Sequence, residues 1–258
     1  MGIDGPARMT AARLAALFAI ATLAIATIAG ADGPKMAHQA GVWAGLTGGA
    51  LEGDVSVAEL QKLGNMGIGA FDRLDGEMAA LDGVFYRIKF DGGAQPATGA
   101  DITAFAVVAD FAPDRTVQLA MVDDIKSLAA ALDRELASVN FVWAARIDGK
   151  FALVKARSVP GFSRPFPRMA EIIKAQSALT YENVEGTLIG FRYPEFAGGV
   201  NYPGWHFHFL TQDRRRGGHA LDVKLEKAQA ALMRLDGFSA LMPKGEDFSR
   251  MNLAPAAK

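Results

Sequence analysis

The pattern of hydrophobic and polar positions along the chain predicts many short strands and a few helices. Runs rich in apolar, β-branched and aromatic residues are typical of strands. The predicted strands include residues 102–111, 187–193, 204–211 and 219–225. Helices are predicted at residues 123–137 and 167–176, and at the capping-box pair Ser56 and Glu59. This mixture predicts an α+β fold built on mixed β-sheets with a few helices.

Two Asp-Gly pairs are each flanked by β-prone runs and predict two hairpins. Asp82-Gly83 lies within EMAALDGVFYRIK, and Asp148-Gly149 separates residues 141–147 from residues 151–158. Asp-Gly is a strong signal for a two-residue hairpin turn. The second segment, VWAARIDGKFALVK, is similar in pattern to the first. This similarity favours two related halves, with chance as the alternative.

The first 31 residues predict an export signal. Arg8 and Arg13 precede the apolar run LAALFAIATLAIATIAG, and the small residues Ala29-Gly30-Ala31 follow it. A basic start, an apolar middle and an A-x-A end are typical of a secretory leader. A membrane-anchoring helix is the alternative, because the run approaches the ~20 residues that span a bilayer. We therefore expect a domain at residues 32–258 that is periplasmic or secreted, and that is membrane-bound only if the leader is uncleaved.

Composition excludes several classes of function. The 258 residues include 27 basic and 28 acidic side chains, with a formal net charge of −1. Such a balance gives no reason to expect nucleic-acid binding, which needs clustered positive charge, and Arg214–Arg216 is predicted to be a solvated turn. Cysteine is absent, which excludes disulfides, Cys-ligated zinc and a Cys nucleophile.

Three of the four histidines fall in the segment GWHFHFLTQDRRRGGHALD. Side chains alternate faces along a strand, so His206 and His208 are expected on one face and the intervening aromatic residues on the other. A loop that ends at Gly217-Gly218 would bring His219 back beside them. Three imidazoles can bind a divalent metal and leave a coordination position open, which is the arrangement of catalytic zinc sites.

Other interpretations of the histidines remain open at this point. The three side chains can be structural, or they can belong to a periplasmic metal-binding protein without catalysis. A cupin-like metalloenzyme also uses H-x-H and a later histidine, but it usually has a glutamate shortly after the pair, whereas FLTQD follows His208 here. The fourth histidine, His38, is expected to be solvated on a mobile segment near a new N-terminus.

Four segments together resemble bacterial α-acetolactate decarboxylases. They are GIGAFDRLDGEMAALDGVFYRI, KARSVPGF, EGTLIGFRYPEFAGGVNYPGWHFHFLTQDRRRGGHALD and LMPKGEDF, and they cover most of residues 50–250 in this order. The resemblance implies a zinc enzyme that converts 2-acetolactate, a small-molecule substrate, to acetoin and carbon dioxide in acetoin and butanediol biosynthesis. It also implies mixed sheets in two related subdomains and, often, a homodimer.

The family's motifs assign a role to five residues. The H-x-H…GGH motif falls on His206, His208 and His219 as zinc ligands. The zinc would polarise the ketone and stabilise an enediolate, since the substrate has its own electron sink. The LDGE motif gives Glu77 as the proton-transfer residue, and the RSVP motif gives Arg157 as the residue that binds the substrate.

The C-terminal part of the chain departs from the family. The family carries a further glutamate in its C-terminal tail, whereas this sequence has no glutamate after position 246. The role is not transferred to Glu246. We expect the missing glutamate to affect catalytic efficiency or stereochemical control, if it affects the enzyme at all.

Overall fold

The computed structural model describes residues 1–2 and 33–253. The chain divides into two units, Met1–Gly33 and Pro34–Lys258. Nearly all of the predicted leader, residues 3–31, lies outside the described residues. Within the described parts of the chain, no helix is both long enough and apolar enough to cross a membrane.

The first of two sheets in Pro34–Lys258 has eight strands. Their order is β13-β1-β7-β3-β4-β5-β6, and β2 pairs with β7 beside this path. The strands are β1 (Met36–Ala40), β2 (Val55–Ser56), β3 (Met66–Phe71), β4 (Glu77–Leu81), β5 (Val84–Ile88), β6 (Ala94–Pro96), β7 (Ile102–Ala109) and β13 (Gly237–Leu241). β3, β4 and nearly all of β7 are buried along their length, which explains their almost continuous apolar sequence.

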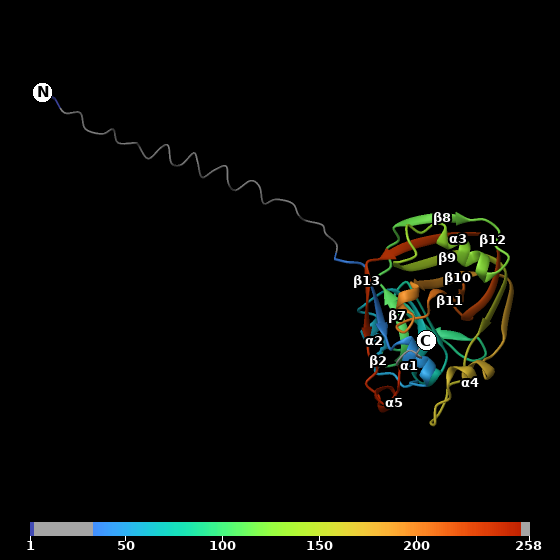
Figure 1. Ribbon diagram of the computed structural model, residues 1–258. Helices are drawn as coiled ribbons and strands as arrows, with labels where there is room; N and C mark the ends of the chain where they lie inside the picture. Colours follow the sequence, from blue (N-terminus) through green and yellow to red (C-terminus); the bar gives the residue numbers. More distant parts are fainter. Residues whose placement is uncertain (3–32, 254–258) are drawn as a thin grey trace. The chain divides into compact units, whose positions relative to one another are not determined.

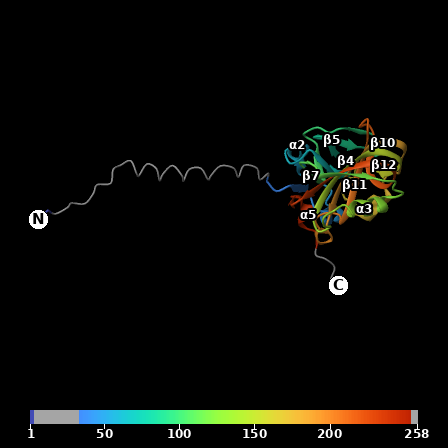
Figure 2. The same ribbon diagram turned by 90° about the horizontal axis from the view of Figure 1, so that it is seen from above.

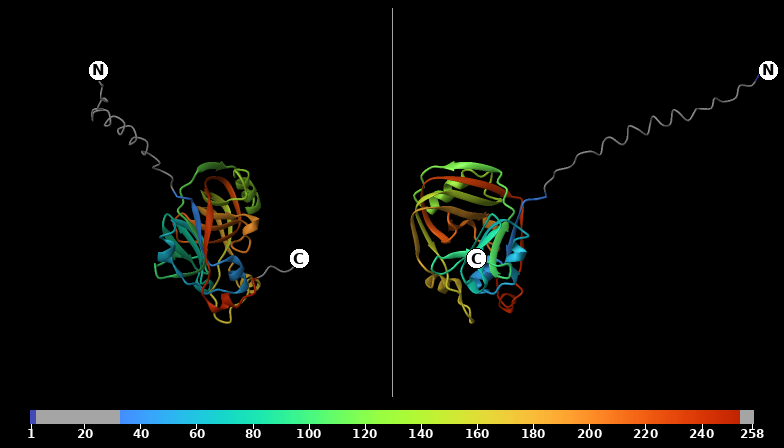
Figure 3. Two further views of the ribbon diagram at one scale, coloured as in Figure 1. Left: turned by 60° about the vertical axis from the view of Figure 1, so that its left-hand side comes forward. Right: turned by 180° about the vertical axis from the view of Figure 1, so that it is seen from behind.

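The second sheet has five strands in the order β11-β10-β9-β12-β8. These are β8 (Arg115–Leu119), β9 (Val142–Arg157), β10 (Leu179–Tyr193), β11 (Gly204–Thr211) and β12 (Gly217–Leu235). β11 also pairs with β12, so that four long strands form a closed ring. Figures 1 and 3 show the two sheets as separate halves of this unit.

Short helices cover the edges of the sheets. They are α1 (Trp43–Gly48), α2 (Val57–Leu60), α3 (Ile125–Asp133), α4 (Met169–Lys174) and α5 (Glu246–Ser249), with 3-10 turns at Asp72–Leu74 and Glu195–Ala197. The predicted capping box is confirmed, because Ser56 and Glu59 bond reciprocally at the start of α2. The predicted helices at 123–137 and 167–176 are found as the shorter α3 and α4. The predicted α+β fold is therefore confirmed.

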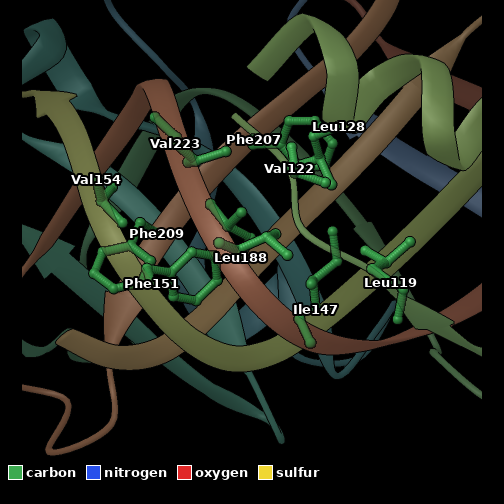
Figure 4. Packing of buried hydrophobic residues seen from close by; sticks show 14 of the residues in the cluster. Leu119, Val122, Leu128, Ile147, Phe151, Val154, Leu188, Phe207, Phe209 and Val223 are labelled. Carbon is green, nitrogen blue, oxygen red and sulfur yellow. The ribbon is translucent and has the colours of Figure 1, made fainter. Parts of the chain in front are cut away.

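The interior of the second sheet is a hydrophobic core (Figure 4). Phe207 and Phe209 of β11 point into it, as the alternation along this strand predicts, and Phe209 meets Phe151 of β9 edge to face at 5.3 Å. α3 contributes Leu128 to the same core. This packing fixes β11 so that its intervening side chains point the other way.

A second core joins the two sheets. Strands β3, β4 and β7 contribute residues such as Ile68 and Ala79, and the second sheet contributes residues such as Ile189 and Leu210. Seen from above in Figure 2, β4 lies against β11 and β12. The chain also crosses between the sheets at Asp236, since this single residue separates β12 from β13. The two sheets are consequently one packed unit.

The hairpin predicted at Asp82-Gly83 is confirmed, and the one predicted at Asp148-Gly149 is wrong. Asp82 and Gly83 have φ angles of 54° and 80°, and they connect β4 to β5. Residues 148 and 149 instead lie inside β9, where they pair with β10 and β12. A Cβ on Gly149 would lie 2.7 Å from that of Ala228, so glycine is required here for close strand packing rather than for a turn.

The part of the chain at residues 33–50 is more ordered than its sequence suggests. β1 and α1 lie in it, and β1 pairs with both β7 and β13. His38 belongs to β1, and its Nδ1 lies 2.9 Å from the hydroxyl of Ser239 on β13. The expectation of a mobile segment is therefore wrong, because partners distant in sequence hold this strand, whereas the His38 side chain is partly exposed to solvent.

We predict that Phe151→Ala lowers the free energy of unfolding by about 3–5 kcal/mol, because it removes a fully buried ring from the core of the second sheet. Urea denaturation followed by tryptophan fluorescence measures the loss. Phe196→Ala is the matched control, since Phe196 is 75% exposed and its removal should change stability little. Equal effects of the two substitutions would contradict the assigned core.

Candidate metal centre

Three histidines converge from two neighbouring strands. His206 and His208 lie two positions apart on β11, so their side chains point to the same face, away from the aromatic core. His219 lies near the start of β12, directly opposite His208. On its other side β12 pairs with β9, where His219 lies opposite Arg157. Three adjacent strands thus place a row of polar side chains on one surface.

Gly217 and Gly218 allow these three strands to approach closely. A Cβ on Gly217 would lie 2.3 Å from the carbonyl oxygen of Phe209 on β11. A Cβ on Gly218 would lie 2.8 Å from the carbonyl oxygen of Arg157 on β9. The expectation that the two glycines end a loop is wrong, because both belong to β12. Their lack of a side chain lets β12 begin between the strands that carry the site.

The three imidazoles are arranged as a ligand set. His206 Nε2 lies 2.9 Å from His219 Nδ1, which lies 3.3 Å from His208 Nε2. Three nitrogens bound to one tetrahedral ion at ~2.0–2.1 Å would lie about 3.3 Å from one another. Two of the three spacings lie within a few tenths of an ångström of this value, and all three ligand atoms lie within 4.8 Å of one another. All three side chains together could hold such an ion.

Burial and hydrogen bonding keep these imidazoles neutral and oriented. His208 Nδ1 lies 2.7 Å from the carbonyl oxygen of Met78. A carbonyl can only accept, so Nδ1 carries the proton and Nε2 presents its lone pair to the site. Burial lowers the pKa of His208 to about 3, and it lowers the pKa of His206 and His219 well below the usual value, with nearby positive charge adding to the effect. Neutral rings are the form that binds metal.

A carboxylate and a guanidinium lie beside the histidines. Glu77, the first residue of β4, is 5% exposed, and its Oε2 is 3.7 Å from His208 Nε2. Its Oε1 is 3.7 Å from Nη1 of Arg157, the last residue of β9. Burial raises the pKa of Glu77 to about 7, although the positive charge of Arg157 acts in the opposite direction. Glu77 is therefore able to hold or release a proton near neutral pH.

These five side chains line one small cavity of about 30 Å³. The rest of its wall is apolar and comes from the first sheet, from α1, from α4 and from the segment after β9. The apolar lining consists of Trp43, Leu46, Gly69, Ala70, Leu74, Phe105, Val159, Met169 and Ile172. Polar groups at one side and apolar groups at the other are typical of a pocket for a small organic molecule.

The structure brings together all five residues that the sequence assigned to the site: His206, His208, His219, Glu77 and Arg157. It places elsewhere two residues to which the sequence assigned no role in the site. His38 lies in β1, and Glu246 of α5 is 78% exposed and paired with Arg250. The apolar wall was not predicted from the sequence, although a spacing of three in the predicted helix at residues 167–176 places Met169 and Ile172 on one face.

The sequence matches a known protein family over most of its length. The profile of the family described as Alpha-acetolactate decarboxylase matches residues 37–255. An α-acetolactate decarboxylase of Methanosarcina mazei is 44% identical over 80% of this chain and 71% of its own length. The corresponding protein of Bacillus subtilis is 34% identical over 84% of this chain and 85% of its own length.

Solved structures have the same fold. A crystal structure of α-acetolactate decarboxylase from Bacillus subtilis aligns with a TM-score of 0.83 at 33% identity, covering 86% of this chain and 94% of that one. A protein of unknown function from Staphylococcus aureus, described as similar to α-acetolactate decarboxylase, aligns with a TM-score of 0.80 at 27% identity. It covers 84% of this chain and 94% of its own.

We predict that His208→Ala weakens the binding of a divalent ion by more than about 100-fold, because it removes one of three ligands and the orientation fixed by Met78. Titration calorimetry with zinc as the probe ion measures the dissociation constant. His38→Ala is the matched control, and it should bind zinc as the unaltered protein does. Tight stoichiometric zinc in His208→Ala would exclude the proposed ligand set.

Proposed function

Because the chain belongs to the alpha-acetolactate decarboxylase family, we propose that it converts 2-acetolactate to acetoin and carbon dioxide with zinc bound by His206, His208 and His219. This reaction makes it a carboxy-lyase. The observation that carries the proposal is one pocket in which three neutral imidazoles, a carboxyl group with a raised pKa and a guanidinium face each other.

The reaction needs an electron acceptor and a source of one proton. The bond between the carboxylate and its carbon breaks, carbon dioxide leaves, and the electron pair stays on the remaining carbon. The neighbouring ketone of the substrate can take up this electron density. A proton must then reach the carbon that lost the carboxylate to give acetoin. No organic cofactor is required, since the substrate contains its own electron acceptor.

The three histidines would hold the electrophile of the site. A divalent ion bound there would act as a Lewis acid toward oxygen and would stabilise negative charge by several kcal/mol. The protein's own contribution is orientation, because the hydrogen bond from His208 to Met78 directs His208 Nε2 into the site and the strand pairing places His219 opposite His208. The surrounding apolar wall limits access of water, which strengthens these electrostatic interactions.

We assign the substrate carboxylate to Arg157. Its guanidinium is 14% exposed and faces the cavity, and it can make two parallel hydrogen bonds to a carboxylate. The strand pairing between Arg157 and His219 fixes its backbone beside the ligand set. A carboxylate held in this way lies next to the group that must receive the electrons when its bond breaks.

We assign the proton transfer to Glu77. A group whose pKa is near the working pH is best suited to give and to take a proton. Burial places the pKa of Glu77 at about 7, so both protonation states are available there. Its carboxyl group lies between Arg157 and His208, so it can reach the hydroxyl or the reacting carbon of a substrate bound at these two residues.

The comparisons favour the decarboxylase over the two alternatives that the histidine pattern left open. The family match covers residues 37–255, so neither a cupin-like enzyme nor a metal-binding protein without catalysis is needed to explain the three histidines. The homodimer that the resemblance implies remains a prediction. The family's C-terminal glutamate has no counterpart in the pocket within the described residues.

We predict that Glu77→Gln lowers kcat by about 100- to 10,000-fold while zinc remains bound, because the amide cannot supply the proton. Acetoin formation from racemic acetolactate measures the rate, and metal analysis measures the zinc content. A chelator should abolish the activity of the unaltered protein, and added zinc should restore it.

Glu246→Gln is the matched control for this experiment, since Glu246 lies outside the pocket. Full activity of Glu77→Gln would remove Glu77 from the proton transfer. Bound zinc without any acetoin from the unaltered protein would exclude the decarboxylase.

We also propose that residues 1–31 direct export and are removed, which leaves Asp32 at the N-terminus of a periplasmic or secreted enzyme. The basic start, apolar run and small residues before Asp32 support this proposal. Intact mass measurement of the protein from periplasmic and membrane fractions provides the test. A mass that includes residues 1–31, found in the membrane fraction, would instead show an anchored enzyme.

A further inference from the structure

The polar and the apolar residues that line the cavity come largely from different elements, and we call the two sets its polar side and its apolar side. The polar side comes from β4, β9, β11 and β12, which carry Glu77, Arg157 and the histidines. Much of the apolar side comes from α1 and α4, which lie next to each other at one end of the unit (Figure 1). No role in the proposed chemistry belongs to these two helices, so their contribution to the pocket needs its own explanation.

α4 presents one face to the pocket. Met169 and Ile172 are three residues apart and line the cavity, and Ile172 is 1% exposed. The remaining residues of the helix face solvent, including Ile173, which is 48% exposed. The six-residue helix α4 therefore contributes two apolar side chains to the cavity wall, the flexible Met169 and the branched Ile172.

The position of α4 is fixed relative to the polar groups. After the helix, the backbone N–H of Ser177 donates to the carbonyl oxygen of Ser158, at 2.9 Å. The hydroxyl of Ser177 in turn accepts from the N–H of Ser158, also at 2.9 Å. Ser158 is fully buried, follows Arg157 directly, and donates its own hydroxyl to the carbonyl oxygen of Ile88. These hydrogen bonds hold the segment after α4 against Ser158, the residue that directly follows Arg157 of the pocket.

The chemistry of the substrate determines what must face this wall. The carboxylate, hydroxyl and ketone of acetolactate all require polar partners, and those partners lie on one side of the cavity. The two methyl groups are then left for the apolar side. The free volume is only about 30 Å³, so the space for these groups depends on the side chains of the wall.

We propose that Met169 and Ile172 of α4 set the size of the alkyl group that the enzyme accepts on the carbon bearing the carboxylate. This inference rests on the proposed decarboxylase function. One methylene in an apolar pocket changes the specificity ratio of an enzyme by about 10- to 200-fold. Shortening the wall should therefore favour a substrate in which an ethyl group replaces that methyl group.

The test compares kcat/KM for acetolactate and for its 2-ethyl homologue. We expect Met169→Ala to raise the ratio of homologue to acetolactate by about tenfold or more. Ile172→Val, which removes one buried methylene and leaves the fold intact, should shift the ratio in the same direction by a smaller factor. Ile173→Ala is the matched control on the solvent face of the same helix, and it should leave the ratio unchanged.

Binding provides a second measurement that does not depend on turnover. Calorimetry gives the dissociation constants of the two unreactive analogues in which the ketone is reduced to a hydroxyl. Met169→Ala should lower the dissociation constant of the ethyl analogue relative to that of the methyl analogue by a similar factor. A merely loosened fold would raise both dissociation constants. The kcat/KM ratio of Ile172→Val decides the matter if Met169→Ala folds poorly.

Each outcome separates the two proposals. No acetoin from the unaltered protein would exclude the proposed function itself. Normal acetoin formation together with unchanged ratios in both wall variants would overturn the inference about α4 and leave the decarboxylase standing. A ratio that changes equally in Ile173→Ala would also overturn it, since that side chain does not reach the cavity.

Discussion

The hydrogen bond from the His208 imidazole to the carbonyl oxygen of Met78 joins the two sheets inside the pocket. Met78 is the residue after Glu77, so the same contact sets the distance between a ring nitrogen and the carboxyl group. It also fixes the tautomer of His208, because the carbonyl can only accept. The histidines and Glu77 come from different sheets, and their relative position depends on this contact and on the apolar core around it.

Burial shifts the pKa values of the site residues in opposite directions, lowering those of the histidines and raising that of Glu77. It disfavours the charged form of each group, so the imidazoles stay neutral and Glu77 tends to keep its proton. A cation held by the histidines would act against burial at Glu77, because its positive charge in the same low-dielectric space would favour the ionised carboxylate. The protein therefore supplies neutral or easily neutralised groups, and Arg157 is the fixed charge among the five.

The sequence predicted the polar part of the site far better than the apolar part. Alternation along β11 is a local property, so it correctly put Phe207 and Phe209 in a core and His206 and His208 on the opposite face. The roles given to Glu77 and Arg157 came from motifs of a recognised family. The wall from α1 and α4 could not be predicted, because it depends on contacts between elements more than a hundred residues apart.

Glycine signals were the least reliable local evidence, for a physical reason. Asp-Gly marks a turn at residues 82–83, where both residues have positive φ. At Gly149 and at Gly217-Gly218 the same residue type serves strands that approach too closely for a Cβ. Sequence alone does not distinguish these two uses, since both require only the absence of a side chain. The correct choice depends on which strands become neighbours.

The pairing of β1 with β13 has a consequence for how the molecule is made. Residues 36–40 lie in register with residues 237–241, almost the full length of the domain away. β13 also follows β12 directly, so the first sheet gains its outer strand only after the second sheet's longest strand has been synthesised. Native structure of such long-range topology forms slowly and late. The strand that opens the domain therefore completes its pairing only after the last strand of the domain has been made.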